Sequence, residues 1–300
     1  MSIIICKIPK AGLGNQLFPL MKSIVLKQIT GLPLIITKYR QFSIGPYLRR
    51  EKSKRRYAGY FKFQKSIFLA WLDEMSLFFY TGYKSVQEPS LQKDQLDKGG
   101  KLKYIYSAIP HWKDYFEGLK DHRDKVIQSF FEMLTPDILQ YVQSKPKPCI
   151  GVHIRMGDFR KLQAGENFAA VGAVRTPEDY FVDIIKNIRE IAGENLPVTI
   201  FTDGYRHEFT QLFDLPAVSI AENNPDIADM VLLSKSKIIV TSAGSTFSYW
   251  SGFLSEAVLI MHPDHLHASI RPGYMMDKLY EGPFDKNNAL LLKNIKTIHE

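Results

Sequence analysis

The sequence is organised around CIGVHIRMGD, the stretch Cys149–Asp158. Its apolar residues predict a short buried strand that ends in His153 and Arg155, which lie on one face because side chains alternate along a strand. A Gly-Asp turn follows. Ligands of α/β proteins bind at the carboxyl ends of buried strands, so Arg155 is expected to hold a ligand. An arginine that only closes a salt bridge at the strand end is the alternative.

The chain beyond this stretch alternates between strand and helix patterns. Thr176 followed by Pro177 predicts a helix start, with Thr176 as the N-cap residue. The expected strands are 149–155, 198–202, 217–220, 238–241 and 258–260, and the expected helices are 176–192, 226–235 and 246–256. This alternation predicts a parallel, doubly wound sheet.

The N-terminal half opens in the same way. A strand at Ile3–Ile8 leads into the Gly-rich stretch PKAGLGNQLF, residues 9–18, and then into a helix that reaches Thr30. Strand, Gly-rich turn and helix form a layout in which free backbone N–H groups and the helix dipole favour an anion. Leu17 stands where the dinucleotide fingerprint needs its third glycine, and the Gly-Lys-Ser/Thr of a P-loop is absent.

Two amide side chains, Asn15 and Gln16, follow the second glycine of this turn. At the start of a helix they are expected to hydrogen-bond a sugar or a phosphate. Capping of the helix by Asn15 is the equal alternative.

The best domain boundary is the run Lys145–Pro148, because two prolines in four residues interrupt any helix or central strand. We therefore expect two α/β domains, residues 1–146 and 147–300, facing one another across a cleft. Ser66–Tyr80 has apolar residues at helical spacing and is expected to be a core helix. The apolar run Leu290–Leu292, in the last helix, suggests that this helix packs back onto the N-terminal domain.

Composition bounds the class of protein. The 300 residues are 45% hydrophobic, which is typical of a packed globular chain. No apolar run approaches the ~20 residues that span a bilayer, and the N-terminus reads directly as a strand, so a cytoplasmic location is expected. Cys6 and Cys149 lie in apolar runs and suit reduced core thiols better than a disulfide.

The formal net charge of +8 indicates anionic partners. The densest basic block, residues 49–56, is a solvated loop or a segment that binds acceptor phosphates or the inner face of an anionic membrane. No nucleic-acid-binding motif accompanies the charge, so nucleic acid is not an expected partner, and a polyanion-binding module is the less favoured alternative.

The polar residues at the strand ends suit a nucleoside diphosphate. Arg155 can bridge two phosphate oxygens, and Ser245 and Thr246 at a helix start offer hydroxyl and N–H groups. A carboxylate, Asp203 or Asp229, can accept hydrogen bonds from the N1–H and amino groups of guanine or from a ribose hydroxyl. No Asp-x-Asp occurs in the sequence, so the usual carboxylate pair for a divalent metal is missing and no metal or other cofactor is expected.

Four motifs, in this order and spacing, resemble the α1,2-fucosyltransferase family, glycosyltransferase family 11. They are GLGNQLF at 12–18, HIRMGDF at 153–159, FTD at 201–203 and STFSYW at 245–250. The resemblance implies a GT-B fold of two Rossmann-like domains, with GDP-fucose held mainly by the C-terminal one. It also implies inversion at the fucose anomeric carbon and transfer to a glycan acceptor, a galactose-terminated oligosaccharide with galactose O2 as the expected hydroxyl.

The resemblance also assigns roles to residues. Arg155 is expected to grip the pyrophosphate, Asp229 to read the guanine from its place sixteen residues before Ser245, and Asn15 to lie near the donor phosphate. Candidates for the catalytic base are Asp158, His111 and Asp114. The full set of candidates is Arg155, Asp158 and Asn15 as catalytic residues and Gly12, Gly14, Gln16, His153, Asp203, Asp229, Ser245, Thr246 and Phe247 as donor-binding residues.

The chain departs from the family pattern at Met156, where the family has a second arginine, and less strongly at Thr246 and Tyr249. The segment between Tyr39 and Gly100, where acceptor recognition is expected, has no close family likeness. The alternative functions are therefore transfer of a different nucleotide sugar or formation of a different linkage. A zinc site in His262–His267 is a further alternative to a plain surface loop.

Overall fold

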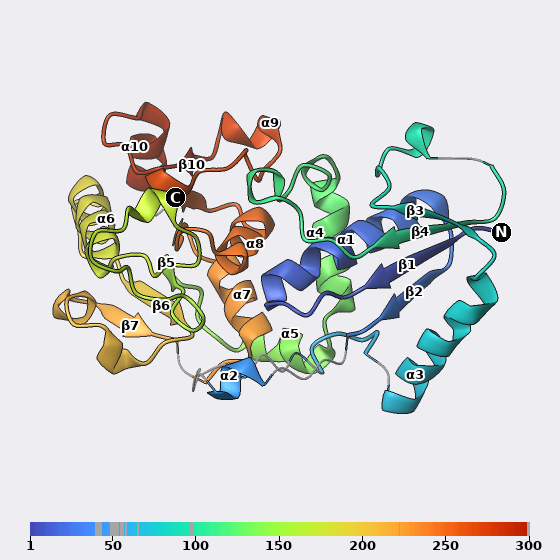
Figure 1. The fold of residues 1–300 in the computed structure, drawn as a ribbon. Coiled ribbons are helices and arrows are strands. Elements are labelled where there is room, and N and C mark those ends of the chain that lie inside the picture. The colour runs from blue at the N-terminus through green and yellow to red at the C-terminus, as the bar shows by residue number, and fades with distance from the viewer. Residues whose placement is uncertain are drawn as a thin grey trace. The chain divides into compact units, whose positions relative to one another are not determined.

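The computed structural model describes residues 1–39, 44–48, 54, 57, 59–64, 66–96, 99–221 and 223–298. The chain forms two compact units (Figure 1). Met1–Phe42 and Arg56–Leu139 make up the first, and Ser43–Arg55 and Gln140–Glu300 the second. The division expected between residues 146 and 147 lies within the second unit. The basic block 49–56 lies outside the described residues, apart from Lys54.

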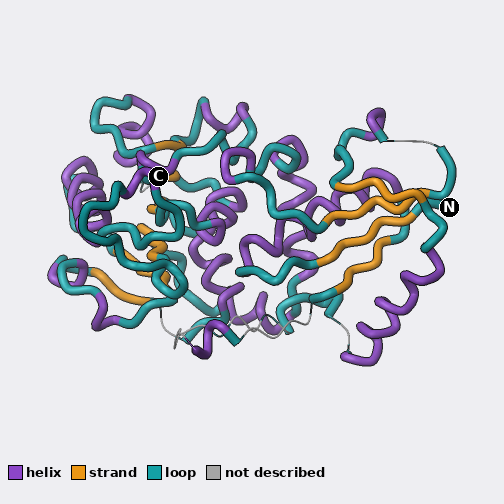
Figure 2. The backbone as a smooth tube through the Cα atoms, in the orientation of Figure 1, coloured by secondary structure: helices purple, strands orange, loops and turns teal. Residues whose placement is uncertain are grey.

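The first unit is built on a parallel sheet whose strands run side by side in Figure 2. Its order is β2-β1-β4-β3. The strands are β1 (Ile3–Lys7), β2 (Leu34–Thr37), β3 (Lys84–Gln87) and β4 (Leu102–Tyr106). Strand β3 is largely polar and exposed, so the apolar pattern of the sequence did not reveal it.

Helices α1 (Leu13–Thr30) and α4 (Arg123–Met133) pack together, and α1 also contacts the sheet. The opposite face carries Ile3, Ile5 and Ile105. Against these residues pack Leu77 and Tyr80 of the short 3-10 helix Leu77–Tyr80, which directly follows α3 (Ile67–Ser76).

The expectation that Ser66–Tyr80 is a core helix is wrong. The segment is helical, but most of its large apolar side chains are exposed, Trp71 and Phe79 among them. The reason is that apolar residues surround the helix, whereas only one of its sides faces the sheet.

The second unit has a six-stranded parallel sheet of order β10-β9-β8-β5-β6-β7. The strands are β5 (Ile150–Ile154), β6 (Val198–Thr202), β7 (Val218–Ile220), β8 (Ile238–Val240), β9 (Val258–Ile260) and β10 (Glu281–Gly282). Strand β5 is central and every one of its residues is buried. Ile154 pairs with Thr202 of β6, so the residues that follow them, Arg155 and Asp203, start from the same edge of the sheet.

The helices of this unit are α6 (Glu178–Ala192), α7 (Asp226–Ser234), α8 (Thr246–Leu254), α9 (Gly273–Met276) and α10 (Ala289–Lys296). Helix α6 begins after Pro177, so Thr176 is not its N-cap residue as expected. Helix α10 places Leu291 and Ile295 in the core of this unit and contacts α6. This corrects the suggestion that the last helix packs onto the N-terminal domain.

The remaining helices are α2 (Gly45–Leu48), α5 (Pro136–Gln143) and the 3-10 segments Lys93–Gln95, Trp112–Asp114, Lys120–His122, Phe168–Ala170, Arg206–Glu208, Leu212–Asp214 and Pro263–His265. Among the described residues, no helix has the length and apolar character needed to cross a membrane.

The α/β class and the two Rossmann-like parallel sheets of a GT-B protein are confirmed. Both cysteines are free thiols, as expected. Burial raises the pKa of the Cys6 thiol to about 12, which keeps it protonated and inert.

Candidate functional site

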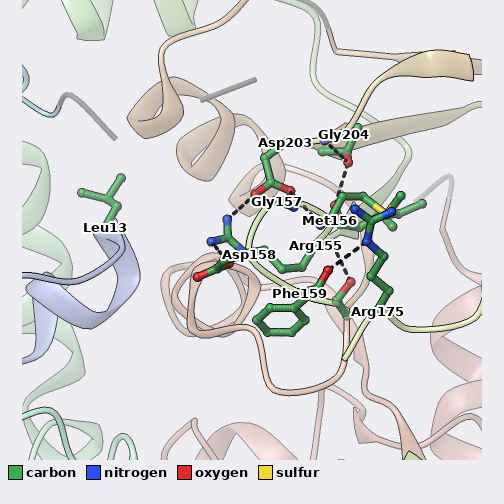
Figure 3. A network of polar contacts seen from close by, with 12 residues as sticks. Leu13, Arg155, Met156, Gly157, Asp158, Phe159, Arg175, Asp203 and Gly204 are labelled. Atoms are coloured by element: carbon green, nitrogen blue, oxygen red, sulfur yellow. Dashed lines mark hydrogen bonds and ion pairs between the residues drawn. The ribbon is translucent and has the colours of Figure 1, made fainter. Parts of the chain in front are cut away.

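Arg155 stands directly after β5 and is held between two carboxylates (Figure 3). Its Nη1 donates to Asp203 Oδ2 at 2.5 Å, and its Nη2 donates to Asp158 Oδ1 at 2.5 Å. The guanidinium also lies 5.8 Å from the centre of the Phe159 ring. These contacts fix a cation, with 19% of its side chain exposed, at the carboxyl end of the central strand.

Asp203 organises the turn around Arg155. Its Oδ1 accepts hydrogen bonds from the backbone N–H groups of Met156, at 2.7 Å, and Gly157, at 3.1 Å, while Oδ2 accepts from Arg155. The side chain is 11% exposed. One carboxylate therefore shapes the backbone after β5 and orients the arginine that emerges from it.

The neighbouring turn between β8 and α8 is tied to the same strand end. Ser242 Oγ accepts from the backbone N–H of Arg155 and donates to the carbonyl of His153, both at 2.9 Å. Thr176 Oγ1 accepts from the N–H of Ala243 at 3.0 Å. Three strand-to-helix connections thus meet at Arg155.

The start of α8 lies in this turn. Gly244 has a φ of +66°, a conformation that other residues adopt only with strain, and Ser245 is the N-cap residue without a side-chain cap hydrogen bond. Ser245 is buried, whereas Thr246 and Phe247 are half-buried. A helix start of this kind carries partial positive charge and suits an anionic group.

His153 lies beneath this helix start. Its ring stacks on Phe247, with 4.9 Å between ring centres, and its Nδ1 is buried without a hydrogen-bond partner in the structure. Burial, with a smaller contribution from the Arg155 charge, lowers its pKa to about 3 against the attraction of Asp203. The imidazole is therefore neutral at physiological pH and adds no charge to the site.

Asp229 belongs to a second group of polar contacts. Asn224 Nδ2 donates to Asp229 Oδ1 at 2.7 Å, and the Tyr141 hydroxyl donates to Asn224 Oδ1 at 2.5 Å. Because α7 packs on α8, Asp229 lies on the helix next to the one that starts at Ser245. The amide holds the carboxylate in one orientation.

Met156, the position of the family's second arginine, is buried in the core of the unit and packs against Gly204. A Cβ atom at Gly204 would lie 2.7 Å from Met156 Cγ. Arg175, also drawn in Figure 3, donates to the Phe159 carbonyl at 2.9 Å and to Glu208 at 3.0 Å, which fastens the loop that follows Asp158.

The other sequence candidates belong to the first unit. Gly12 is the N-cap residue of α1, with an ordinary φ of −63°, so the alternative that Asn15 caps this helix is wrong. Gly14 is buried in the first turn of α1, and Gln16 Nε2 donates to the Ala11 carbonyl at 2.9 Å.

Asn15, on the same turn of α1, has a buried Oδ1 atom without a hydrogen-bond partner in the structure. An amide group that is buried without such a partner is costly in a folded protein. This cost marks Asn15 as the member of the Gly-rich turn that is best suited to meet a ligand.

Two of the candidate bases also lie in the first unit. His111 and Asp114 flank and end the 3-10 segment Trp112–Asp114, and His111 Nδ1 accepts from the N–H of Lys113 at 3.3 Å. Asp158 lies in the second unit beside Arg155.

The histidines at 262–267 pack with aromatic rings. His262 lies 4.6 Å from Tyr180 and 4.8 Å from Phe168, measured between ring centres. In the part of the chain that the structure describes, no three His, Cys, Asp or Glu side chains form a group that could hold a metal ion. The zinc alternative therefore has no cluster to support it among these residues.

Sequence reasoning singled out Arg155, Asp203, His153 and Asp229 as candidates, but it did not single out the residues whose hydrogen bonds hold this part of the structure. Three of their hydrogen bonds join residues that are 67 to 87 positions apart, namely those of Ser242 with Arg155, Thr176 with Ala243 and Tyr141 with Asn224. Asn224 is close to Asp229 in the sequence and contacts it from the loop before α7. The one available signal was position, because Ser242 follows strand β8 as Arg155 follows β5.

Comparisons with known proteins agree with the order of the motifs. The model of glycosyl transferase family 11 matches residues 9–266. A search of curated proteins finds no match to the sequence.

Solved structures similar to this chain include three fucosyltransferases. NodZ from Bradyrhizobium is 13% identical, with a TM-score of 0.49 over 88% of this chain and 98% of that one. A variant of FUT1 from Arabidopsis thaliana in complex with GDP is 12% identical, with a TM-score of 0.47 over 91% and 76%. POFUT1 in complex with GDP-fucose is 13% identical, with a TM-score of 0.44 over 96% and 98%.

Proposed function

Since the chain belongs to glycosyl transferase family 11, we propose that it transfers L-fucose from GDP-fucose to a hydroxyl group of a glycan acceptor. The proposal includes inversion at the anomeric carbon, independence of a metal ion and the O2 of a terminal galactose as the hydroxyl that attacks. The observation that carries it is Arg155, a cation fixed at the carboxyl end of β5 beside the start of α8.

The chemistry needs positive charge where the leaving group forms. As the bond from fucose to GDP breaks through an oxocarbenium-like transition state, negative charge builds on the β-phosphate. Arg155 can neutralise that charge with two parallel N–H donors, a geometry that lysine does not offer. Each well-placed donor of this kind lowers the activation free energy by about 3 kcal/mol.

The start of α8 supports the same charge. The backbone N–H groups of Thr246 and Phe247 lie in the first turn of this helix, where its dipole favours an anion. In this account the NH2 group of Asn15 in the first unit is a further, uncharged donor. Arg155 and the start of α8 supply the positive charge that a divalent metal gives other nucleotide-sugar enzymes, which supports metal independence.

The guanine base is assigned to Asp229. A carboxylate can accept from the N1–H and the amino group of guanine at once, and no other common base offers that pair of donors. The hydrogen bond from Asn224 to Oδ1 holds the carboxylate in place for this contact. Exchange of GDP for UDP or ADP should therefore weaken binding.

The acceptor hydroxyl attacks the fucose from the face opposite to the diphosphate and must lose its proton. Asp158 is our first candidate for the base, because it is at the site and its side chain is 35% exposed. His111 and Asp114 remain the alternatives. Asp158 is also bound to Arg155, so its role is separable only by pH profiles of the Asp158→Asn variant.

The second candidate function is transfer of a different sugar from another nucleotide. Thermal shifts with GDP, UDP and ADP separate the two, since a ligand that binds the folded state raises the melting temperature. We expect stabilisation by GDP alone.

The test of the function is incubation with GDP-fucose and a panel of β-galactosides and β-galactosyl-N-acetylglucosamine acceptors, with and without EDTA, followed by NMR linkage analysis. We expect an α1,2-linked product that EDTA does not suppress. A different linkage would refute the acceptor assignment, and failure of every acceptor together with no binding of GDP would refute the function.

A further inference from the structure

Helix α3 and the 3-10 segment after it expose large apolar side chains along their length. Phe68 is 64% exposed, Trp71 54% and Phe79 84%. Leu72 and Met75 are each 41% exposed. Large apolar patches of this kind on a protein surface mark sites of interaction with another molecule or with a membrane.

The spacing of these residues places them on one side of the helix. Phe68, Leu72 and Met75 of α3 follow one another at intervals of three or four residues, which brings them into a single stripe, and Trp71 lies beside it. Phe79 continues the stripe on the 3-10 segment, while the exposed Leu69 and Phe78 lie to either side of it. We call Phe68, Trp71, Leu72, Met75 and Phe79 the α3 stripe.

The opposite side of the helix is anchored on its own unit. Leu77 and Tyr80 pack against the face of the sheet that carries Ile3 and Ile5. Glu74 Oε1 accepts a hydrogen bond from the backbone N–H of Lys38, the residue after β2, at 3.3 Å. Helix α3 contacts the edge strand β2, and Figure 1 shows the two elements next to each other. The helix is therefore held in place, and the exposed stripe residues face away from the sheet.

Lysines gather at the C-terminal end of the stripe. Lys103 Nζ donates to the Tyr80 carbonyl at 3.3 Å, and Lys101 Nζ lies 5.9 Å from the centre of the Tyr83 ring. The exposed Lys84 follows Tyr83 directly. Aromatic rings and ammonium groups thus alternate where the stripe ends.

We propose that the α3 stripe binds the surface of an anionic phospholipid bilayer. Aromatic and aliphatic side chains would enter the boundary between headgroups and acyl chains, with the helix lying in the plane of the membrane. Lys84, Lys101 and Lys103 would contact lipid phosphates, and tyrosine rings suit the same layer.

Charge selects the lipid over a second copy of the chain. Two copies meeting through this surface would bring the same three lysines together, in a protein that already carries a net charge of +8. An anionic bilayer complements that charge instead. The inference goes beyond the proposed function and does not depend on it.

The experiment is flotation of the full chain with vesicles of phosphatidylcholine alone or with one third phosphatidylglycerol. The wild type is expected to float with the anionic vesicles and to be released by 0.5 M NaCl. Trp71→Ser with Phe79→Ser should lower the partition coefficient at least tenfold, because both side chains are exposed and, apart from the stacking of Trp71 on Phe68, the change removes lipid contacts. Tyr274→Ser, at a residue 63% exposed on α9, is the matched control and should float as the wild type does.

A second variant tests the lysines. Lys84→Glu with Lys101→Glu should lower partitioning into the anionic vesicles more than tenfold, while Lys278→Glu with Lys286→Glu should change it less. Circular dichroism checks that each variant is folded.

Three results would overturn the proposal. One is failure of the wild type to float. Another is a dimer in solution that the stripe variant dissociates, which would make a second copy the occupant. The third is flotation that the stripe variant leaves unchanged, and a raised KM of that variant for a soluble galactoside would then make the stripe an acceptor surface. If the wild type floats with the anionic vesicles as expected but transfers no fucose, that result would count against the proposed function alone.

Discussion

Two arginines of the second unit, Arg155 and Arg271, are held in opposite ways. Arg155 ends the central strand, meets two carboxylates and keeps 19% of its side chain exposed. Arg271 is fully buried, and its donors go mostly to the backbone. Nε bonds the Gly252 carbonyl at 3.0 Å, Nη1 the Ala257 carbonyl at 2.8 Å and Nη2 the Ser255 hydroxyl at 2.8 Å.

The difference separates a structural cation from one that can exchange partners. Arg271 joins the end of α8 to the start of β9, and the buried Glu281 carboxylate, 4.0 Å away, balances its charge. A ligand cannot reach it. The carboxylates around Arg155 hold it at the surface, so a diphosphate can replace part of their contacts without leaving a buried charge.

The largest effect on stability is expected when the buried Arg271 is removed. Arg271→Ala leaves Glu281 and two carbonyls without their partner in a dry core, and we expect the free energy of unfolding to fall by about 3–5 kcal/mol. The activity per folded molecule should stay near that of the wild type. Urea unfolding followed by fluorescence gives the first quantity, and active-site titration gives the second.

The control is the double variant Arg271→Met with Glu281→Gln, which fills a similar volume without either charge. Its free energy of unfolding should fall less than that of Arg271→Ala. An Arg271→Ala variant as stable as the wild type would contradict the structural role.

A smaller effect is expected when Asp203, the carboxylate that orients Arg155, is changed. In Asp203→Asn the side-chain oxygen can still accept from Met156 and Gly157, but the NH2 group then faces the guanidinium. We expect kcat/KM to fall about 10- to 100-fold and the free energy of unfolding to fall by about 1–3 kcal/mol.

Asp158→Asn is the control for the loss of a negative charge beside Arg155. Asp158 is the other carboxylate that binds Arg155, but it is more exposed than Asp203. Its effect on stability should stay below about 1 kcal/mol. Because Asp158 is also the first candidate for the base, the two variants are compared in stability alone, and equal losses of stability would mean that Asp203 does not position Arg155.

A further effect, seen only when the pH is lowered, concerns His153, which lies in β5 close to Arg155. The pKa of His153 is lowered by burial to about 3 in the folded state, below its ordinary value of about 6.5 in the unfolded chain. The unfolded state therefore binds the extra proton as the pH falls from 6.5 toward 3, and the stability present above pH 6.5 is lost across that window. Between pH 7 and pH 5 this loss is about 2 kcal/mol.

His153→Asn should flatten the fall of stability over that range, measured by urea unfolding at several pH values, whereas His207→Asn at an exposed position should not. Burial also lowers the pKa of His262 and His267, so part of the slope remains in both variants. A slope unchanged in His153→Asn would contradict the assignment.

Sequence patterns were sufficient for the parts of the site that lie at strand ends. Arg155 and Asp203 follow residues that are paired across β5 and β6, so alternation of strands and helices already places them at one edge. The contacts of Ser242 with Arg155 and of Tyr141 with Asn224 could not be foreseen, because the partners are 87 and 83 positions apart in the sequence and the contacts depend on the register of neighbouring elements.

The failure at α3 has a different physical cause. Helical spacing of apolar residues predicts a helix, but it does not say how many sides of that helix are covered. Leu77 and Tyr80 meet the sheet, and Trp71 and Phe79 do not. An apolar helix with one covered side is the pattern expected of a surface that has a partner of its own.

The most direct test of the account is titration calorimetry of GDP and GMP with the wild type and with Arg155→Ala. If Arg155 holds the β-phosphate, the wild type binds GDP more tightly than GMP, and the variant loses about a hundredfold in GDP affinity but much less in GMP affinity. The melting temperature should fall less than that of Arg271→Ala. An Arg155→Ala variant that binds GDP within threefold of the wild type would contradict the central claim.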